Sequence, residues 1–108
     1  MEKTLDMDTA AACLAELGHP TRLRVFRLLV RAGPEGLPVG TLQSHLDIPG
    51  ATLSHHLRHM LSAGLIVQER EGRVLRCCLV YRRVEALLEF LMSDCCAGLA
   101  AFPEANAA

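Results

Sequence analysis

The 108-residue sequence predicts a mostly α-helical domain with one small β-hairpin, arranged as a winged helix-turn-helix. Two observations predict this fold. A short helical stretch, a four-residue break and a longer helical stretch with one polar face follow one another over residues 39–63, which is the spacing of a helix-turn-helix. Two stretches with strand character come directly afterwards, over residues 65–81, and would form the wing. Because the chain is short and has no internal repeat or linker, we expect a single domain, 1–108.

Two helices are predicted before this unit. The first spans residues 8–17, with Asp8 as its N-cap. The second begins at Pro20, because proline at the first helical position has no N–H donor to lose, and Gly33-Pro34 ends it. Its expected core face holds Leu23, Phe26 and Val30, and its opposite stripe holds Arg24, Arg27 and Arg31.

The helix-turn-helix consists of a two-turn helix over residues 39–46, the break Asp47–Gly50 and a helix over residues 51–63. The apolar face of the second helix holds Leu53, Leu57, Met60 and Leu61. Its polar face holds Thr52, Ser54, His55, Arg58, His59 and Ser62. The second helix of such a unit enters the major groove of DNA, so this polar face is expected to meet bases and phosphates.

The wing is predicted as two strands, 65–70 and 73–81, joined by the two-residue turn Glu71-Gly72. Three arginines surround its tip, at positions 70, 73 and 76. A last helix over residues 82–97 has an apolar face that includes Cys95, and residues 99–108 are expected to form a flexible tail.

The net charge of −1 hides an uneven distribution along the chain. Residues 19–83 contain ten arginines and four carboxylates, a balance of +6. The two flanks hold one lysine and eight carboxylates, a balance of −7. A basic centre between acidic ends indicates that the middle of the chain meets a polyanion such as DNA, although chance clustering on solvated helix faces would give the same count.

Other classes of protein are disfavoured. No apolar stretch approaches the roughly 18 residues of a membrane-spanning helix, and the N-terminus does not resemble a signal peptide, so no membrane partner is expected. Five cysteines, an odd number without a secreted framework, predict reduced thiols in the cytoplasm. His55 and His59 lie one helical turn apart and could bind zinc, which leaves a metal-binding protein or enzyme as a remote alternative. No H-E-x-x-H motif or activated nucleophile accompanies them, so we do not expect an enzyme.

Three motifs resemble the ArsR/SmtB family of bacterial metal-responsive repressors. The segment Leu17–Arg24 is similar to the family's L-A-D-P-T-R-L-R opening, with His19 in place of the usual aspartate. Residues 54–66 resemble its recognition helix, S-x-H-L-x-x-L followed by A-G-L-V, and Arg70–Arg73 resembles its wing tip. The resemblance covers residues 10–97.

This resemblance implies a homodimeric winged-helix repressor that pairs through its first and last helices, binds an inverted-repeat operator and leaves it when an inducer binds. It implies DNA contacts at Ser54 and His56, and the polar face and the wing supply the others. The complete set of expected DNA contacts is Thr52, Ser54, His55, His56, Arg58, Arg73 and Arg76.

The cysteines bear on the inducer. The Cys-x-Cys arsenic site of the family is absent, because the helix at 39–46 has no thiol, and the last helix has no histidine for a zinc site. Cys95 and Cys96 remain as candidate metalloid ligands, since some arsenic-responsive members carry such a pair and soft thiolates prefer thiophilic centres. Adjacent helical residues point about 100° apart, so both sulfurs would reach one atom only if the last turn of the helix loosens.

The family members with this pair usually carry a third cysteine a few residues later, and residues 97–108 contain none. A monomethyl arsenical needs only two thiolates, so the inducer expected is methylarsenite, with arsenite or antimonite as alternatives, and no permanently bound cofactor is expected. Whether Cys77 or Cys13 supplies a third ligand, from the same chain or across the dimer, stays open, although buried apolar packing is the expected role of both. A thiol redox or persulfide switch on the same fold is the alternative function.

Overall fold

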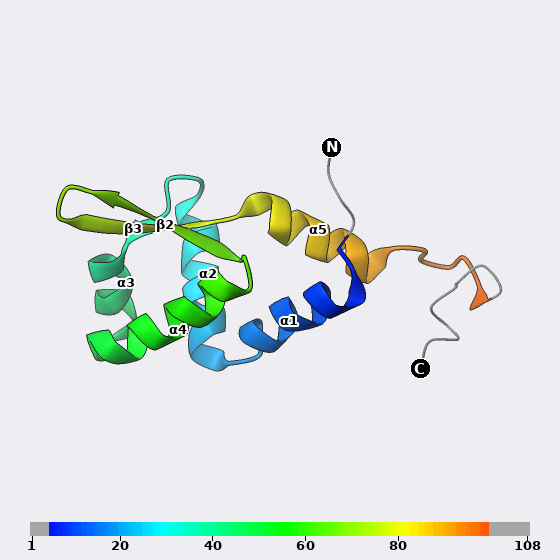
Figure 1. The fold of residues 1–108 in the computed structure, drawn as a ribbon, viewed down its shortest axis with the longest axis horizontal. Coiled ribbons are helices and arrows are strands. Elements are labelled where there is room, and N and C mark those ends of the chain that lie inside the picture. The colour runs from blue at the N-terminus through cyan, green and yellow to red at the C-terminus, as the bar shows by residue number, and fades with distance from the viewer. Residues whose placement is uncertain (1–4, 100–108) are drawn as a thin grey trace.

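The computed structural model describes residues 5–99, and within this range it contains five helices and three strands (Figure 1). Their bounds are α1 Met7–Leu17, α2 Pro20–Ala32, β1 Leu37–Pro38, α3 Val39–Leu46, α4 Gly50–Ser62, β2 Ile66–Glu71, β3 Val74–Leu79 and α5 Tyr81–Met92. Helices α3 and α4 form the helix-turn-helix, and β2 and β3 form the wing. The predicted winged helix-turn-helix is therefore confirmed.

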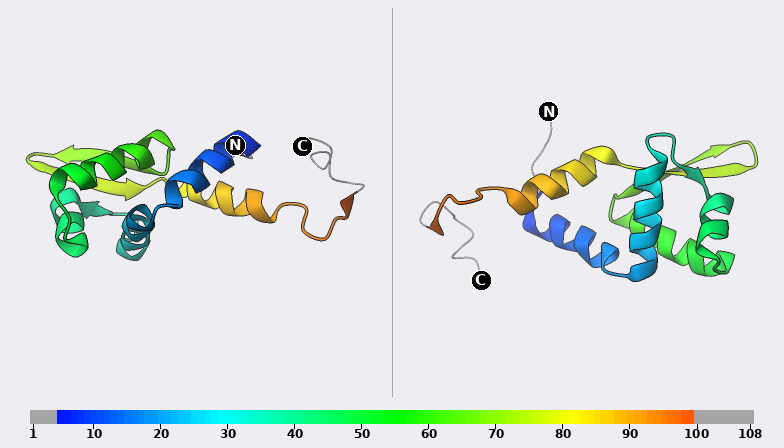
Figure 2. Two further views of the ribbon diagram at one scale, coloured as in Figure 1. Left: turned by 90° about the horizontal axis from the view of Figure 1, so that it is seen from below. Right: turned by 180° about the vertical axis from the view of Figure 1, so that it is seen from behind.

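The elements divide the molecule into two ends joined by α2. Helices α3 and α4 and the wing lie at one end, and α1 and α5 lie side by side at the other (Figures 1 and 2). Helix α2 contacts α1, α3, α4 and β3, which places it at the centre of the domain. The recognition helix and the expected dimerisation helices are thus at different ends of a short, densely connected unit.

The core is built on α2, but not with the residues that the sequence pattern indicates. Val25 and Leu29 are fully buried, whereas Leu23 and Val30 of the predicted core face are exposed. Phe26 and Leu28 pack against the core from either side of this line. Because neighbours cover α2 on several sides, its buried arc is broad, and helical spacing alone does not locate the centre of that arc.

The three strands form an antiparallel sheet in the order β1-β3-β2. Glu71 pairs with Val74, so the two-residue turn of the wing consists of Gly72 and Arg73, not of the predicted Glu71 and Gly72. Gly72 has a φ of 64°, and glycine with positive φ at the first turn position suits a type II′ hairpin turn. The corrected register places Arg73 in the turn itself.

Helix α1 begins one residue earlier than predicted. Asp6 is its N-cap, because the Thr9 N–H donates to Asp6 Oδ1 at 2.7 Å, and Asp8 lies in the first turn, where a carboxylate favours the positive end of the helix dipole. Helix α2 begins at Pro20 as predicted, and the ring of His19 caps it by accepting from the Thr21 N–H at 3.1 Å.

Helix α5 ends at Met92, five residues before the predicted end at residue 97. Ser93 has extended backbone angles, and its hydroxyl donates to the Phe90 carbonyl at 2.8 Å, a local bond that competes with continued helix. Asp94 and Cys96 then have φ values of 59° and 64°, which an α-helix does not allow. The cysteine pair therefore lies in a turn after the helix and not on its apolar face.

The predicted flexible tail, 99–108, lies outside the described residues apart from Leu99. Within residues 5–99, no helix combines the length and the apolar character needed to cross a membrane.

Candidate DNA-binding surface and thiol pair

The outer side of α4 carries four of the predicted DNA contacts. Thr52, Ser54, His55 and Arg58 are all exposed, and we call these four residues the polar arc. His55 and Arg58 border a shallow depression of about 330 Å³ on this surface. Hydroxyl and imidazole groups can hydrogen-bond to base edges, and a guanidinium can contact phosphate, so the polar arc has the chemistry of a recognition surface.

His56 does not lie on this surface. Its side chain is 6% exposed and points into the domain, where the ring stacks against His19 with 4.5 Å between centroids. The Arg22 Nε–H donates to His56 Nδ1 at 3.2 Å. Because an arginine side chain is always a donor, Nδ1 must be an unprotonated acceptor and the ring is neutral. The resemblance places His56 at the DNA, whereas the structure places it in the interior as a partner of Arg22.

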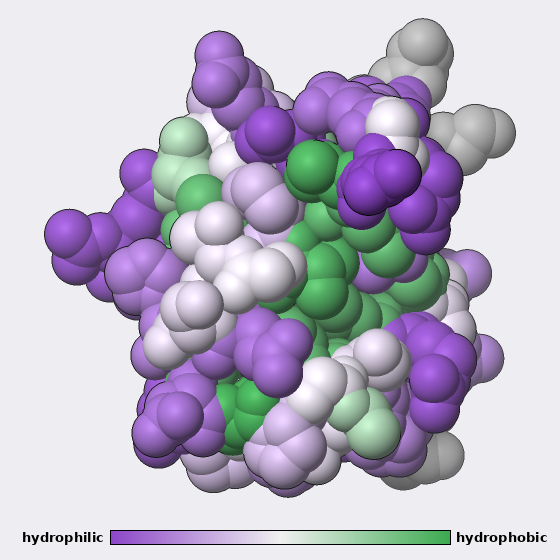
Figure 3. Space-filling model, turned by 90° about the vertical axis from the view of Figure 1, so that its left-hand side faces the viewer, coloured by the Kyte–Doolittle hydropathy of each residue, from purple (hydrophilic) through white to green (hydrophobic). Residues whose placement is uncertain are grey.

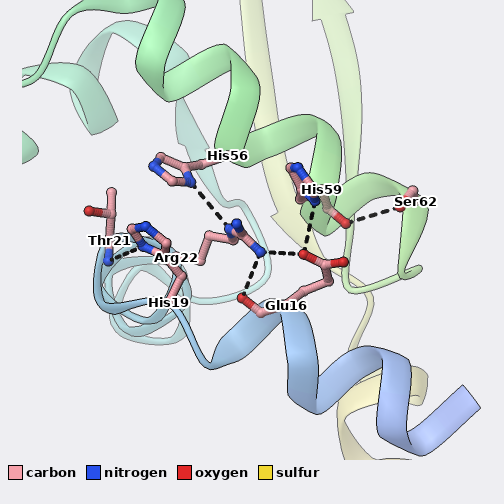
Figure 4. Close-up of polar contacts among 7 residues, drawn as sticks. All are labelled: Glu16, His19, Thr21, Arg22, His56, His59 and Ser62. Atoms are coloured by element: carbon pink, nitrogen blue, oxygen red, sulfur yellow. Dashed lines mark hydrogen bonds and ion pairs between the residues drawn. The ribbon is translucent and has the colours of Figure 1, made fainter.

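A polar network connects three helices next to this ring (Figure 4). The carboxylate of Glu16, at the end of α1, pairs with the Arg22 guanidinium of α2 and with His59 Nδ1 of α4, the latter at 3.0 Å. Arg22 Nη1 also donates to the Glu16 carbonyl at 3.4 Å. Burial, followed by the positive charges of His19 and Arg22 nearby, lowers the pKa of His56 below its usual value.

The wing presents two free arginines and holds a third in place. Among residues 5–99, Arg70 and Arg73 are exposed and have no carboxylate partner. Arg76 Nε donates to the Glu71 carboxylate at 3.2 Å, and its Nη1 donates to the Glu35 carbonyl at 3.3 Å. Arg76 therefore ties the wing to the loop before β1, and it is not a free side chain at the tip as the sequence pattern indicates.

An apolar hollow separates the wing from the helix-turn-helix. Figure 3 views this end of the molecule and shows a band of hydrophobic residues between hydrophilic ones. Val39 of α3, Leu57 of α4 and Leu75 of β3 line a cavity of about 230 Å³, which Ser54 and Arg58 border. One edge of the polar arc thus adjoins an apolar floor that extends to the wing.

The three arginines of α2 belong to another surface. Arg24, Arg27 and Arg31 are exposed along a groove of about 600 Å³ between α2 and α3, which His45 also lines. The positive charge of the centre of the chain is therefore divided between the side of the polar arc and wing and the side of this groove.

Cys95 and Cys96 lie next to each other in space as well as in sequence. Both are exposed, and their sulfurs are 3.5 Å apart. The turn is held by backbone bonds from Cys95 N–H to Met92 and from Ala97 N–H to Asp94, at 3.3 and 3.0 Å. The left-handed conformation of Cys96 brings both side chains to the same side, so the convergence that the sequence predicts only after a helix loosens is already present.

The other three cysteines are occupied inside the domain. The Cys13 thiol is buried and donates to the Ala63 carbonyl at 3.5 Å, and buried Cys77 accepts from Gln68 Nε2 at 3.4 Å. Cys78 is partly exposed and contacts the Glu35 carbonyl at 3.6 Å. Burial raises the pKa of the Cys77 and Cys78 thiols, which disfavours the thiolate form that binds soft metals. The expected buried packing role of Cys77 and Cys13 agrees with these positions.

No group of three or more His, Cys, Asp or Glu side chains within the described part of the chain is arranged to hold a metal ion. The histidines of α4 illustrate why: His55 and His59 face each other edge to face at 4.6 Å, but His59 is bound to Glu16 and His56 to Arg22. The remote alternative of a histidine metal site gains nothing from this arrangement.

An apolar surface runs over α1 and α5 at the other end of the domain. Leu88, Leu91 and Met92 of α5 are 59%, 50% and 66% exposed, and Met7 and Leu14 of α1 are also exposed. Because the two helices are neighbours, these side chains belong to one end of the molecule (Figure 1). An exposed apolar surface of this kind on a small domain marks a site of association.

A helix-turn-helix domain family matches residues 17–69 of the chain. An uncharacterised HTH-type transcriptional regulator of Methanocaldococcus jannaschii is 34% identical over 65 residues, which cover 60% of this chain and 71% of that protein. A candidate arsenical resistance operon repressor, ArsR, of Halobacterium salinarum is 30% identical over 67 residues, which cover 62% of this chain and 51% of that repressor. The chain belongs to the ArsR family of helix-turn-helix transcriptional regulators.

Solved structures of ArsR-type proteins have the same fold. A candidate transcriptional regulator for arsenical resistance matches with a TM-score of 0.67 and 28% identity, over 76% of this chain and 82% of that one. The homodimeric winged helix-turn-helix DNA-binding domain of a candidate ArsR-family regulator from Mycobacterium bovis matches with a TM-score of 0.64 and 22% identity, over 82% of each chain. The family and the fold are those of DNA-binding transcriptional regulators.

Sequence reasoning missed two residues of this ArsR-family site, Glu16 and Arg22. Both read as surface charges, because a carboxylate near a helix end and an arginine in the first turn of the next helix are common in solvated positions. The available signal was their spacing across the α1–α2 turn, six residues apart around Gly18 and Pro20, which brings the two side chains together when the chain reverses.

Proposed function

We propose that this ArsR-family regulator is a homodimeric repressor that binds an inverted-repeat operator and is released when a trivalent arsenical binds Cys95 and Cys96. The observation that carries the proposal is the pair of exposed thiols whose sulfurs lie 3.5 Å apart directly after α5. The relatives described as arsenical resistance regulators support the class of inducer.

The distance between the sulfurs suits a shared central atom. Two thiolates bonded to one atom at about 2.3 Å, the bond length of zinc thiolates, lie less than about 4.6 Å apart. The observed 3.5 Å is within this limit, so the pair needs little rearrangement to act as a chelate. Thiols are soft donors and favour thiophilic elements over hard cations such as Mg²⁺ or Ca²⁺.

A pair of thiols fits methylarsenite better than arsenite. In methylarsenite, CH₃As(OH)₂, the carbon–arsenic bond stays intact, and each thiol displaces one hydroxyl group as water, which gives CH₃As(S-Cys)₂ and two water molecules. Arsenite has a third hydroxyl group to displace, and within residues 5–99 the remaining thiols are engaged inside the domain. We therefore expect methylarsenite to be the preferred inducer, with arsenite and antimonite binding more weakly.

The DNA-binding surface in this proposal consists of the polar arc of α4 together with Arg73 of the wing. Arg70 joins it as an exposed arginine near the tip. His56 is left out because it is buried, and Arg76 acts on DNA only through its hold on the wing. The arginines supply affinity through phosphates, whereas the hydroxyl and imidazole groups of the polar arc read base edges.

The dimer in this proposal forms through the apolar surface of α1 and α5, as the homodimeric neighbour supports. The thiol pair lies within four residues of the end of α5, so a ligand that bridges the sulfurs changes the turn next to this interface. A shift at the interface changes the spacing of the two recognition helices, and a coupling free energy of about 1–3 kcal/mol changes operator affinity roughly 5- to 150-fold.

A binding titration tests the proposal. The protein is bound to a fluorescent operator fragment carrying the inverted repeat nearest its own gene, and methylarsenite, arsenite, antimonite, zinc and peroxide are added separately. We expect release at the lowest concentration with methylarsenite, loss of that response in Cys95→Ser and Cys96→Ser, and a normal response in the control Cys78→Ser.

Two other outcomes contradict parts of the proposal. A full arsenical response in the variant that lacks both thiols would exclude the pair as the sensor. Release by peroxide but not by arsenicals, abolished by the same substitutions, would favour the redox or persulfide switch, for which two exposed thiols are equally suitable.

A further inference from the structure

The carboxylate of Glu16 is a junction between three helices (Figure 4). It lies near the C-terminal end of α1, and its side chain is only 22% exposed. On one side it pairs with Arg22 of α2, and on the other it accepts from His59 of α4 at 3.0 Å. One partly buried negative charge is thus shared between two basic side chains from different helices.

The junction continues to the inner face of the recognition helix. Arg22, which is 12% exposed, uses Nη1 for Glu16 and Nε for His56 Nδ1. His56 and His59 are three residues apart on α4, so one turn of the helix is held at two points. Both points depend on the same carboxylate, since Glu16 also orients the guanidinium that faces His56.

Few other polar contacts connect α1 with α4. Among the described residues, the Cys13 thiol donates to the carbonyl of Ala63, just after α4, and Glu16 pairs with His59. The first is a weak sulfur bond at the helix end. The Glu16 contact involves a charged group in a partly buried site, where such interactions are stronger than at the surface.

We propose that Glu16 is a positioning residue through which the dimerisation helix α1 sets the orientation of the recognition helix α4. This inference rests on the proposed function, because it gives α4 its operator and α1 its partner. A displacement of α1 at the dimer interface moves the Glu16 carboxylate, and His59 and Arg22 transmit that movement to the polar arc.

The charges around the junction determine how firmly it holds. The groups that face it are Glu16 from α1, His19 and Arg22 from the start of α2, and His55, His56 and His59 from α4. Glu16 is the one anion in this set of described residues. Its neutralisation leaves a guanidinium beside four imidazoles with no compensating charge, so α2 and α4 are expected to separate slightly.

The substitution Glu16→Gln tests this inference, because it removes the charge and keeps the shape. The matched control is Glu85→Gln, a carboxylate on exposed α5 with no hydrogen bond or ion pair in the described structure. Two quantities are measured on the free dimer and on the operator complex: amide hydrogen exchange of residues 50–62, and operator affinity by fluorescence anisotropy. We expect faster exchange in α4 and an affinity roughly 3- to 10-fold lower for Glu16→Gln, with the dimer dissociation constant unchanged.

A double-mutant cycle separates positioning from a general structural effect. If Glu16 acts through His59, then Glu16→Gln combined with His59→Phe weakens operator binding no more than the stronger single variant. His59→Asn, whose amide nitrogen takes the place of Nδ1, should restore most of the affinity lost in His59→Phe. Additive losses in the cycle would overturn the inference.

The exchange measurement also distinguishes failure of this inference from failure of the proposed function. Unchanged exchange in α4 of Glu16→Gln excludes a positioning role, whether or not the protein binds the operator. Faster exchange in a protein that binds no operator would contradict the proposed repressor and overturn the stated effect on DNA affinity, while leaving the helix contact itself in place.

Discussion

Gly36 is the residue whose replacement should damage the wing most, although it lies outside it. It precedes β1 with a φ of +67°, directly against β3. A Cβ atom at this position would lie 2.0 Å from the Cys77 carbonyl oxygen and 2.7 Å from the Cys78 sulfur. The first of these is a backbone atom of the central strand, which cannot move without shifting the sheet.

The expected loss of stability in Gly36→Ala has two parts. The left-handed backbone costs an alanine about 1–2 kcal/mol. Forcing a methyl group into a filled site adds about 1–3 kcal/mol. Together they remove about 2–5 kcal/mol from the free energy of unfolding, which for a small domain is on the order of 5–15 kcal/mol in total.

Gly72→Ala is the matched control, because Gly72 has a similar φ of +64° and a Cβ there would meet no atom within 4 Å. Urea unfolding at one fixed protein concentration, since a dimer is expected, gives the free energy of each variant. Gly36→Ala should be less stable than Gly72→Ala by about 1–3 kcal/mol, the overpacking part alone. Equal losses in the two variants would refute the proposed close contact between the β1 loop and β3.

Three further predictions concern charge and assembly. Burial lowers the pKa of His56, so the unfolded chain, with a histidine pKa of about 6.5, binds more protons below neutral pH; the free energy of unfolding should fall as pH decreases through about 6.5 towards the lowered folded value, and His56→Asn, but not His55→Asn, should flatten this dependence in urea titrations at several pH values. In operator-binding titrations against salt, Arg73→Gln should reduce the slope of log K against log salt by about 1 per contact, whereas Arg24→Gln on the α2 groove should leave it unchanged; equal effects would place both arginines on DNA. Leu91→Glu should raise the dimer dissociation constant at least roughly 100-fold in analytical ultracentrifugation, because it introduces a charge where about 1.5–3 kcal/mol of apolar burial per side chain is expected, and a dimer as tight as the unmodified one would exclude this surface as the interface.

The sequence predicts the helix-turn-helix and the wing well because their signals are local. Proline and glycine break the chain on either side of α3 and α4, and each helix has one clear apolar face, so periodicity locates Leu53, Leu57 and Met60 in the core. The turn of the hairpin is misplaced by one residue, since Glu71-Gly72 and Gly72-Arg73 are both acceptable turn dipeptides. Only the pairing of Glu71 with Val74 distinguishes them.

The errors at α2 and at the end of α5 have a different origin. Periodicity assumes that a helix buries one narrow stripe, whereas α2 has neighbours on several sides and buries Val25 and Leu29. At the end of α5, an apolar pattern that includes Cys95 predicts continued helix, but the bond from the Ser93 hydroxyl to the Phe90 carbonyl favours the end at Met92. Side-chain caps of this kind depend on one rotamer, which a sequence pattern does not specify.

The same limit applies to His56, whose neighbours on α4 are exposed. A histidine among polar residues on a recognition helix suggests a DNA contact, and the resemblance to the family agrees. Its burial depends on Arg22 from a different helix, which fills the position where a water molecule or a base would otherwise be the partner. A contact between residues 34 positions apart cannot be read from spacing along one helix.

The distribution of arginines explains why assembly should control this repressor. With the α2 arginines on a separate groove and Arg76 paired inside the domain, one protomer offers DNA only three exposed arginines on α4 and the wing, Arg58, Arg70 and Arg73. So few phosphate contacts give weak binding at physiological salt, whereas a dimer doubles their number and makes the second half-site an intramolecular event. Loss of the correct spacing between the two halves therefore lowers affinity far more than the loss of any one contact. An inducer bound beside α5 needs to touch no DNA-binding residue to release the operator.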